Sequence, residues 1–388
     1  MTRVHGLDLA RALALLGMML NHLGPANQLM VDYLGPANPV SDGYPSALFA
    51  VLAGVSMGII ARRVAPGASE HGSDAADNLL RTRFRLVLRG VILFGLGAVL
   101  SSVQSAIGEV LTAIGLSYLL LTPVMAWSNR RLSVLLGIVA VFGPLLAMAD
   151  NVLIFNWTNE WFASLLFGFY PILAWLAYQL TGLLIYRLVV RPADSDEAES
   201  GAVRRELGLA GTGLVLLVGV RLLVEIADLR VDPEDTVTAL GYYLQGEPHS
   251  GGLMDVLGSA GAAMMVIGLC LLICRVGAVV WVTYPLRAMG SMSLTVYVVH
   301  VVASNIGWGT FLTVSSIYAE GASDSQIDEA NLLWVFDAQA LGFLIFASLW
   351  RWAFRRGPLE WVMHRMIEGA VRPSQPAIAE SVTRSTHG

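Results

Sequence analysis

The sequence predicts an all-α integral membrane protein, a polytopic bundle of about ten transmembrane helices, and three observations predict this class. Of the 388 residues, 55% are hydrophobic and only 14% are charged, and the mean hydropathy is +0.64. A soluble domain of this length needs more charge to cover its surface. The apolar residues form runs about as long as a bilayer is thick. Finally, the chain contains arginine but no lysine, and the arginines are concentrated in alternate loops.

Ten apolar runs are the expected membrane spans. They fall at about 7–23, 46–61, 84–103, 107–127, 132–149, 163–190, 207–227, 253–276, 285–306 and 332–353. The first two are short for a bilayer, so their boundaries are approximate. A further stretch at 359–367 is amphipathic, which is typical of a helix on the membrane surface. We expect one transmembrane domain over 1–370 and a disordered cytoplasmic tail over 371–388.

The arginines predict the orientation. They follow the second, fourth, sixth, eighth and last runs, whereas the other loops are almost free of them, Arg230 being an exception. By the positive-inside rule the arginine-rich loops face the cytoplasm, which places both termini there. Asp8 and Arg11 interrupt the start of the first run and no A-x-A site follows it, so we expect a retained helix rather than a signal peptide. The composition suggests the cytoplasmic membrane of a bacterium.

The two cysteines do not indicate a metal site. Cys270 and Cys274 lie four residues apart inside an apolar run. No CxxC, HExxH or other pattern with metal-ligand spacing is present in the sequence. We expect two small residues that pack between helices, with neither a bound metal nor a structural disulfide.

The first run contains the most informative polar residues. Arg11 and His22 are eleven residues apart, which returns them to nearly the same helical face, about 16 Å apart along the axis. Asp8 lies near that face, one turn before Arg11. A cation near the cytoplasm and an imidazole deeper in suit a tunnel for a long anionic cofactor. Histidine can act as a base and then as an acid near neutral pH, although an interfacial histidine without a function is the alternative.

The ninth run carries a second polar stripe. Ser293, Tyr297, His300 and Ser304 are spaced by four, three and four residues, so they share one helical face. His300 should lie in the outer half of the membrane, at a depth similar to that of His22. Packing between helices is the alternative function of such residues.

A basic ridge leads into the third run. Arg81, Arg85 and Arg89 recur every four residues and therefore share one helical face. The planar guanidinium group suits phosphate oxygens. Determination of the topology alone would also account for the ridge.

Four segments resemble those of the membrane acyltransferases. LDLARALALLGMMLNH resembles the first helix of acyltransferase family three, in which an Arg, ten residues and a His follow one another. LFAVLAGVSMGIIARR resembles the second helix, and LLRTRFRLVLRGVILFGLGAVL with GEVLTAIGLSYLLL resembles the third and fourth. PLRAMGSMSLTVYVVH resembles the penultimate signature helix. The relatives include heparan-α-glucosaminide N-acetyltransferase and bacterial proteins like it.

The resemblance implies transfer of an acyl group, usually acetyl, from cytoplasmic acyl-CoA to an acceptor on the outer side. The acceptor would be an envelope glycan or glycolipid, and nucleic acid is not an expected partner. His22 would deprotonate the acceptor or carry the acyl group itself. His300 and Tyr297 would help to hold the acceptor or the thioester carbonyl.

The same resemblance assigns the cofactor-binding residues. Arg11, with Asp8 beside it, would bind acyl-CoA, together with the ridge of Arg81, Arg85 and Arg89. No metal is implied.

Two other functions fit a polytopic membrane protein. In a transporter or flippase the polar stripes would line a permeation path. Against a transporter, the sequence shows no internal repeat and no pair of Gly/Pro-broken helices in matching positions. In a catalytically silent scaffold the Arg11 and His22 pattern would have no purpose.

Overall fold

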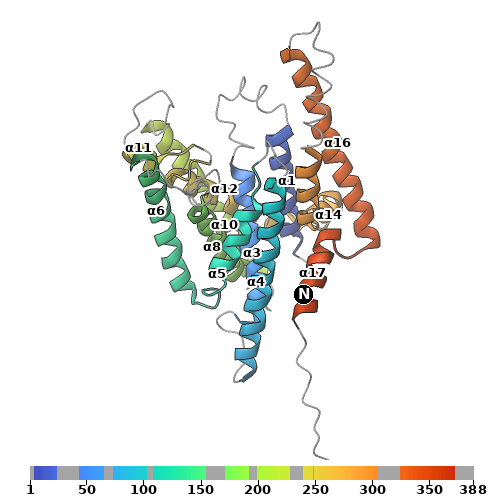
Figure 1. The fold of residues 1–388 in the computed structure, drawn as a ribbon, viewed down its shortest axis with the longest axis horizontal. Helices are drawn as coiled ribbons and strands as arrows, with labels where there is room; N and C mark the ends of the chain where they lie inside the picture. Colours follow the sequence, from blue (N-terminus) through green and yellow to red (C-terminus); the bar gives the residue numbers. More distant parts are fainter. Residues whose placement is uncertain are drawn as a thin grey trace, which may run out of the picture.

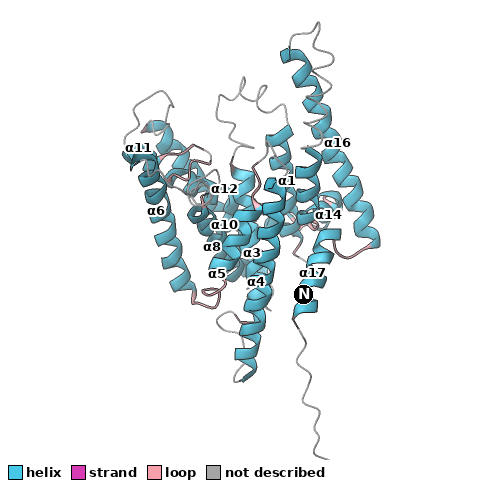
Figure 2. Cartoon of the chain, viewed as in Figure 1, coloured by secondary structure: helices cyan, strands magenta, loops and turns pink. Residues whose placement is uncertain are grey.

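The computed structural model describes most of the chain as a helical bundle. It describes residues 4–23, 43–64, 73–102, 108–153, 171–191, 199–227, 239–247, 249–304 and 324–371, and the regular structure in these ranges is helical (Figure 2). Residues 372–388 of the predicted tail lie outside the described residues. The all-α prediction is therefore confirmed.

Figure 1 labels most of the helices, which follow one another along the chain. They are α1 His5–Leu23, α3 Tyr44–Ile60, α4 Ser73–Ser102, α5 Leu111–Leu121, α6 Asn129–Leu153, α8 Ile172–Ile185, α10 Glu199–Ile226, α11 Ala239–Leu244, α12 Leu253–Ile273, α13 Gly277–Val282, α14 Tyr284–Gly290, an unlabelled helix Ser293–Ser304, α16 Asp324–Ala353 and α17 Pro358–Ala370. A 3₁₀ turn Ala61–Arg63 extends α3, and a π-helical segment Tyr186–Val190 extends α8.

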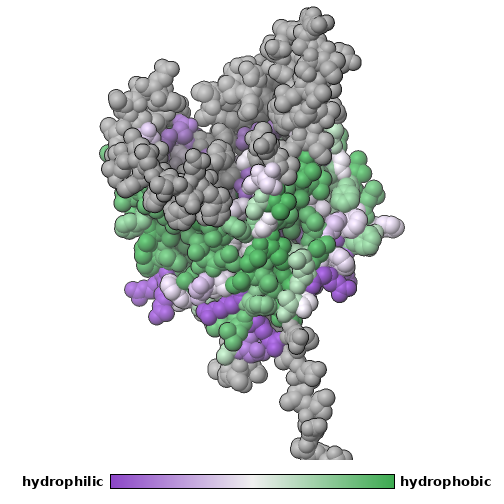
Figure 3. Space-filling model, viewed as in Figure 1, coloured by the Kyte–Doolittle hydropathy of each residue, from purple (hydrophilic) through white to green (hydrophobic). Residues whose placement is uncertain are grey.

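The bundle is that of an integral membrane protein. Within the described ranges, five helices are long and apolar enough to cross a bilayer, or six if a bent pair counts as one span. Figure 3 shows an apolar band across the middle of the molecule, with hydrophilic side chains at the end where α17 and the first turns of α4 lie. The count of ten spans and the cytoplasmic position of the termini stay predictions.

The predicted ninth span is not one straight helix. Its residues form α14 and the helix Ser293–Ser304, whose axes differ by 82°. The backbone turns at Ser291 and Met292, where the Ser291 hydroxyl donates to the Ala288 carbonyl at 2.7 Å. The prediction of a continuous helix over 285–306 was wrong. An apolar run reports length and hydropathy, but it does not report the backbone dihedrals that set a kink.

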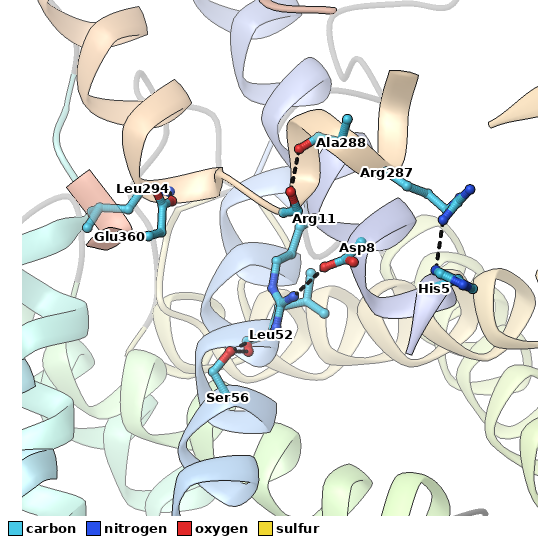
Figure 4. A network of polar contacts seen from close by, with 10 residues as sticks. His5, Asp8, Arg11, Leu52, Ser56, Arg287, Ala288, Leu294 and Glu360 are labelled. Carbon is cyan, nitrogen blue, oxygen red and sulfur yellow. Dashed lines mark hydrogen bonds and ion pairs between the residues drawn. The ribbon is translucent and has the colours of Figure 1, made fainter. Parts of the chain in front are cut away.

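The new helix is capped by a carboxylate from far along the chain. Glu360 of α17 accepts hydrogen bonds from the backbone N–H groups of Leu294 and Thr295, at 2.7 and 3.2 Å. These donors have no partner within their own helix, so the carboxylate satisfies them. Its negative charge also interacts favourably with the positive, N-terminal end of the helix dipole. The capping attaches α17 to the helix that carries His300 (Figure 4).

Close backbone contacts place α1 at the centre of the bundle. It packs against α3, α12, α14 and α16. A side chain at Gly290 of α14 would come within 1.8 Å of the Asp8 carbonyl oxygen, so only glycine permits this approach to α1. Gly54 and Gly182 allow α3 and α8 to meet in the same way. Small residues at helix crossings are the usual means of packing helices in a membrane.

Candidate active site

The first polar group on α1 is an ion pair. Arg11 Nη1 donates to Asp8 Oδ1 at 3.0 Å, and Arg11 Nη2 donates to the Ser56 hydroxyl of α3, also at 3.0 Å (Figure 4). The Asp8 side chain is 5% exposed and that of Arg11 is 18% exposed. Asp8 therefore holds the guanidinium group in place, and the expected proximity of the two residues is confirmed.

The second polar group joins α1 to the helix Ser293–Ser304. His22 Nδ1 lies 3.1 Å from His300 Nε2, although the residues are 278 positions apart. The ring planes differ by only 5° and the ring centroids are 5.4 Å apart, which suits a hydrogen bond in the plane of both rings. The structure thus brings together the two histidines that the sequence places at similar depth.

Two further side chains complete the polar cluster. His300 Nδ1 lies 2.9 Å from Gln339 Oε1 of α16 and 3.3 Å from the Ser304 hydroxyl. Gln339 Nε2 donates to the same hydroxyl at 3.4 Å. His300 and Ser304 are buried. We call His22, His300, Ser304 and Gln339 the histidine cluster.

Sequence reasoning missed Gln339. It lies within the last apolar run, where an uncharged polar side chain resembles a packing residue. Its only signal was an amide inside a membrane span, where polar groups seek partners.

Tyr297 has a fixed position one turn before His300. Its hydroxyl oxygen accepts a hydrogen bond from the Val110 backbone N–H at 2.9 Å. Its ring stacks on Phe49 of α3, with centroids 5.7 Å apart. The side chain is fully buried. These contacts connect the helix that carries His300 to α3 and to the start of α5.

A large basic cavity lies at the other end of α1. Its volume is about 980 Å³, and it is formed by α4, α17 and the end of α3. Six arginines line it, Arg62, Arg81, Arg85, Arg89, Arg355 and Arg356, against three carboxylates, Asp77, Glu360 and Glu368. We call it the arginine cavity. The predicted ridge on α4 is thus one wall of a site with excess positive charge.

The arginines of the ridge differ in their partners. Arg81 pairs with Asp77 at 2.7 Å, and Arg85 pairs with Glu368 of α17 at 3.3 Å. The buried Nε atom of Arg89 has no hydrogen-bond partner among the described residues, and its guanidinium group lies over the Tyr118 ring. The buried Nε atom of Arg85 is likewise without a partner among these residues, so both Arg85 and Arg89 have buried donor capacity left for a ligand.

Arg11 and Arg89 meet at a second, smaller cavity. It has a volume of about 50 Å³, and its lining includes both arginines together with Ser56, Tyr118 and Phe49. Arg89 also lines the arginine cavity, so the two spaces share a wall. Phe49 in turn stacks on Tyr297, one turn from His300. The order of contacts along α1 is therefore arginine cavity, Arg11, aromatic pair and histidine cluster.

A histidine of α17, His364, also lines the arginine cavity. Burial and the neighbouring Arg356 lower the pKa of His364, while Glu368 acts in the opposite direction. His364 is consequently neutral near pH 7 and adds no charge to the cavity at that pH.

Comparison with known proteins places this helical bundle in a class. The family described as "Heparan-alpha-glucosaminide N-acetyltransferase, catalytic" matches residues 3–220. A second family, described as "Protein of unknown function (DUF418)", matches residues 236–370. The protein is thus a membrane acyltransferase. More than half of the chain lies in the first match, so the chain belongs to the heparan-alpha-glucosaminide N-acetyltransferase catalytic family. No curated protein matches the chain.

The candidate site draws on both matched regions. Arg11, His22 and the ridge on α4 fall within residues 3–220. His300 and Gln339 fall within residues 236–370. The histidine cluster therefore requires both parts of the chain.

Proposed function

We propose that the protein transfers an acyl group, in the first instance acetyl, from cytoplasmic acyl-CoA to a hydroxyl or amine on the outer side of a bacterial cytoplasmic membrane. The acceptor is an envelope glycan or glycolipid. The observation that carries the proposal is the hydrogen-bonded His22–His300 pair at the end of α1 opposite the arginine cavity. The family assignment supports acetyl transfer as the reaction.

The donor would bind by its phosphates in the arginine cavity. Arginine forms paired, charge-assisted hydrogen bonds with phosphate oxygens, and six arginines face three carboxylates there. By the positive-inside rule this end faces the cytoplasm, where acyl-CoA is available. The acyl arm would pass Arg11, with Asp8 holding that side chain, and the Phe49–Tyr297 pair to reach His22.

His22 would act as the general base. Its Nε2 atom removes the proton from the acceptor hydroxyl or amine while the acceptor atom bonds to the thioester carbonyl carbon. The carbon–sulfur bond then breaks, and the protonated His22 returns the proton to the leaving thiolate to give free CoA. The Tyr297 hydroxyl would contact the thioester carbonyl. In an alternative order of steps, His22 itself receives the acyl group from the thioester, which releases CoA, and then passes the acyl group to the acceptor.

The test uses detergent-purified protein and labelled acetyl-CoA. We expect specific binding that Arg11→Ala weakens and that Arg130→Ala, an exposed arginine at the start of α6, does not change. We expect His22→Ala to bind the donor normally but to lose transfer to an α-glucosaminide by roughly 10²–10⁴-fold, the usual contribution of a general base. Release of free CoA thiol measures the rate.

Two outcomes would contradict the proposal. Transfer at the wild-type rate by His22→Ala would remove the catalytic assignment. Failure of the folded wild type to bind any acyl-CoA would favour the transporter or flippase. Transporters use discontinuous helices in matching positions of two repeats. Among the described residues a single bent pair is found, α14 with the next helix, so a matching partner for it is not seen there.

A further inference from the structure

We propose that Gln339 is a positioning residue that fixes the tautomer of His300 and, through it, that of His22. In this arrangement His22 Nε2 carries no proton and is ready to act as the base. The inference rests on the proposed catalytic role of His22 and adds Gln339 as the residue that sets its tautomer.

The first step is the contact between Gln339 and His300. An amide oxygen can only accept a hydrogen bond, so His300 Nδ1, at 2.9 Å from Gln339 Oε1, must carry a hydrogen and donate it. The amide nitrogen of Gln339 donates to Ser304 instead. The amide oxygen of Gln339 thus faces the His300 ring, and its nitrogen faces Ser304.

The second step follows from the chemistry of a neutral imidazole. A ring with its hydrogen on Nδ1 has an accepting lone pair on Nε2. His300 Nε2 therefore accepts from His22 Nδ1 at 3.1 Å. With its own hydrogen on Nδ1, neutral His22 has an unprotonated Nε2. Through these two hydrogen bonds, the orientation of the Gln339 amide sets the tautomer of His22.

The third step concerns the proton during the reaction. When His22 Nε2 takes a proton from the acceptor, the ring becomes a cation and its hydrogen bond to His300 becomes charge-assisted, hence stronger. The proton on His22 Nδ1 can move to His300 Nε2, which spreads the charge over both rings. Gln339 cannot be protonated at neutral pH, so the proton stays within the pair until the thiolate leaves.

A carboxylate at position 339 would have a different effect. Glutamate could accept the same hydrogen bond from His300 Nδ1, but its charge would stabilise a cationic His300. His300 Nε2 would then donate to His22 Nδ1, and the hydrogen of His22 would move to Nε2, the atom that must be free. The neutral amide keeps the resting pair uncharged.

The experiment compares three variants by their kcat and KM over pH, with acetyl-CoA and an α-glucosaminide. Gln339→Glu keeps the size of the side chain and the acceptor atom. We expect the pH above which this variant is active to lie about 1–3 units higher than in the wild type, because an adjacent opposite charge stabilises the protonated form of His300 to about that extent. Gln339→Leu should lower kcat about 10–100-fold, as loss of an orienting partner typically does, with an unchanged donor KM. Ser348→Ala, also on α16, removes only a hydroxyl bonded to the Leu344 carbonyl and should match the wild type.

A second measurement does not depend on activity. In protein containing ¹⁵N-labelled histidine, the nitrogen shifts distinguish protonated from unprotonated ring atoms. We expect an unprotonated His22 Nε2 in the wild type and a protonated one in Gln339→Glu at neutral pH; the His22→Ala sample identifies the signal. A hydrogen on His22 Nε2 in the wild type would overturn the inference.

The kinetics separate this inference from the proposed function. If the pH profile of Gln339→Glu superimposes on the wild type while His22→Ala is inactive, Gln339 has no positioning role and the function stands. If His22→Ala is active, the proposed function itself fails.

Discussion

The polar sites at the two ends of α1 are built in different ways. The arginine cavity is wide, about 980 Å³, and two of its six arginines, Arg81 and Arg85, form ion pairs with carboxylates. The histidine cluster is narrow and mostly buried, and its members contact one another in sequence. A wide site with several cations can lose one of them and still attract an anion. In the histidine cluster, His22 is joined to the rest through one hydrogen bond to His300, so loss of a member should lower the rate rather than the donor affinity.

After the loss of His22 itself, the largest expected effect comes from removing His300, the middle member of the His22–His300–Gln339 chain. His300→Ala removes the acceptor for His22 Nδ1, so the tautomer of His22 is no longer set. We expect transfer to fall roughly 10²–10³-fold, within the range of general acid–base catalysis, with unchanged acetyl-CoA affinity. His300→Gln supplies an amide oxygen near the former Nε2 position and should recover part of the rate. A loss of donor affinity with an unchanged kcat would instead assign His300 to donor binding.

The intermediate effect concerns the arginine cavity. Arg89→Gln removes the guanidinium group with an unpartnered buried Nε, and we expect acetyl-CoA binding to weaken about tenfold, equivalent to one charge-assisted hydrogen bond. Adding Arg85→Gln should weaken binding further and reduce its dependence on salt. The rate at saturating donor should change little. Arg131→Gln, exposed on α6, is the matched control. Equal losses in the control would show that total charge, not the cavity, attracts the donor.

The smallest expected effect has the opposite sign. Glu368 pairs with Arg85 at 3.3 Å, and both side chains are partly exposed. Removing this competitor by Glu368→Gln should tighten acetyl-CoA binding about two- to fivefold, consistent with the small free energy of an exposed ion pair. Isothermal titration would detect the change. Weaker binding in this variant would mean that Glu368 holds Arg85 in the conformation that the donor needs.

The part of the site that lies on single helices could be predicted from the sequence. The helical repeat places Asp8 beside Arg11 and aligns Arg81, Arg85 and Arg89, and the structure has both arrangements. Depth along a helix also follows from residue number. This is why His22 and His300 were expected at one level.

Contacts between distant segments could not be predicted. Gln339 meets His300 across 39 positions and Glu360 caps a helix 65 positions earlier; one sequence contains no information on such pairs. The 82° bend was missed because Ser291 and Met292 interrupt the helix without interrupting the apolar run. The count of ten spans depends partly on residues outside the described ranges and stays a prediction.

The distance between the two histidines along the chain has a consequence for biosynthesis. His22 is translated near the start and its partner 278 residues later, with Gln339 later still. Proteins are made from the N-terminus, and early segments take up structure first. A chain that ends before α14 would lack the histidine pair, and it would also lack α17 with Arg355 and Arg356, which line the arginine cavity. Both proposed sites are therefore completed only by the last segments of the polypeptide, and we expect unfinished molecules neither to form the full donor site nor to consume the thioester.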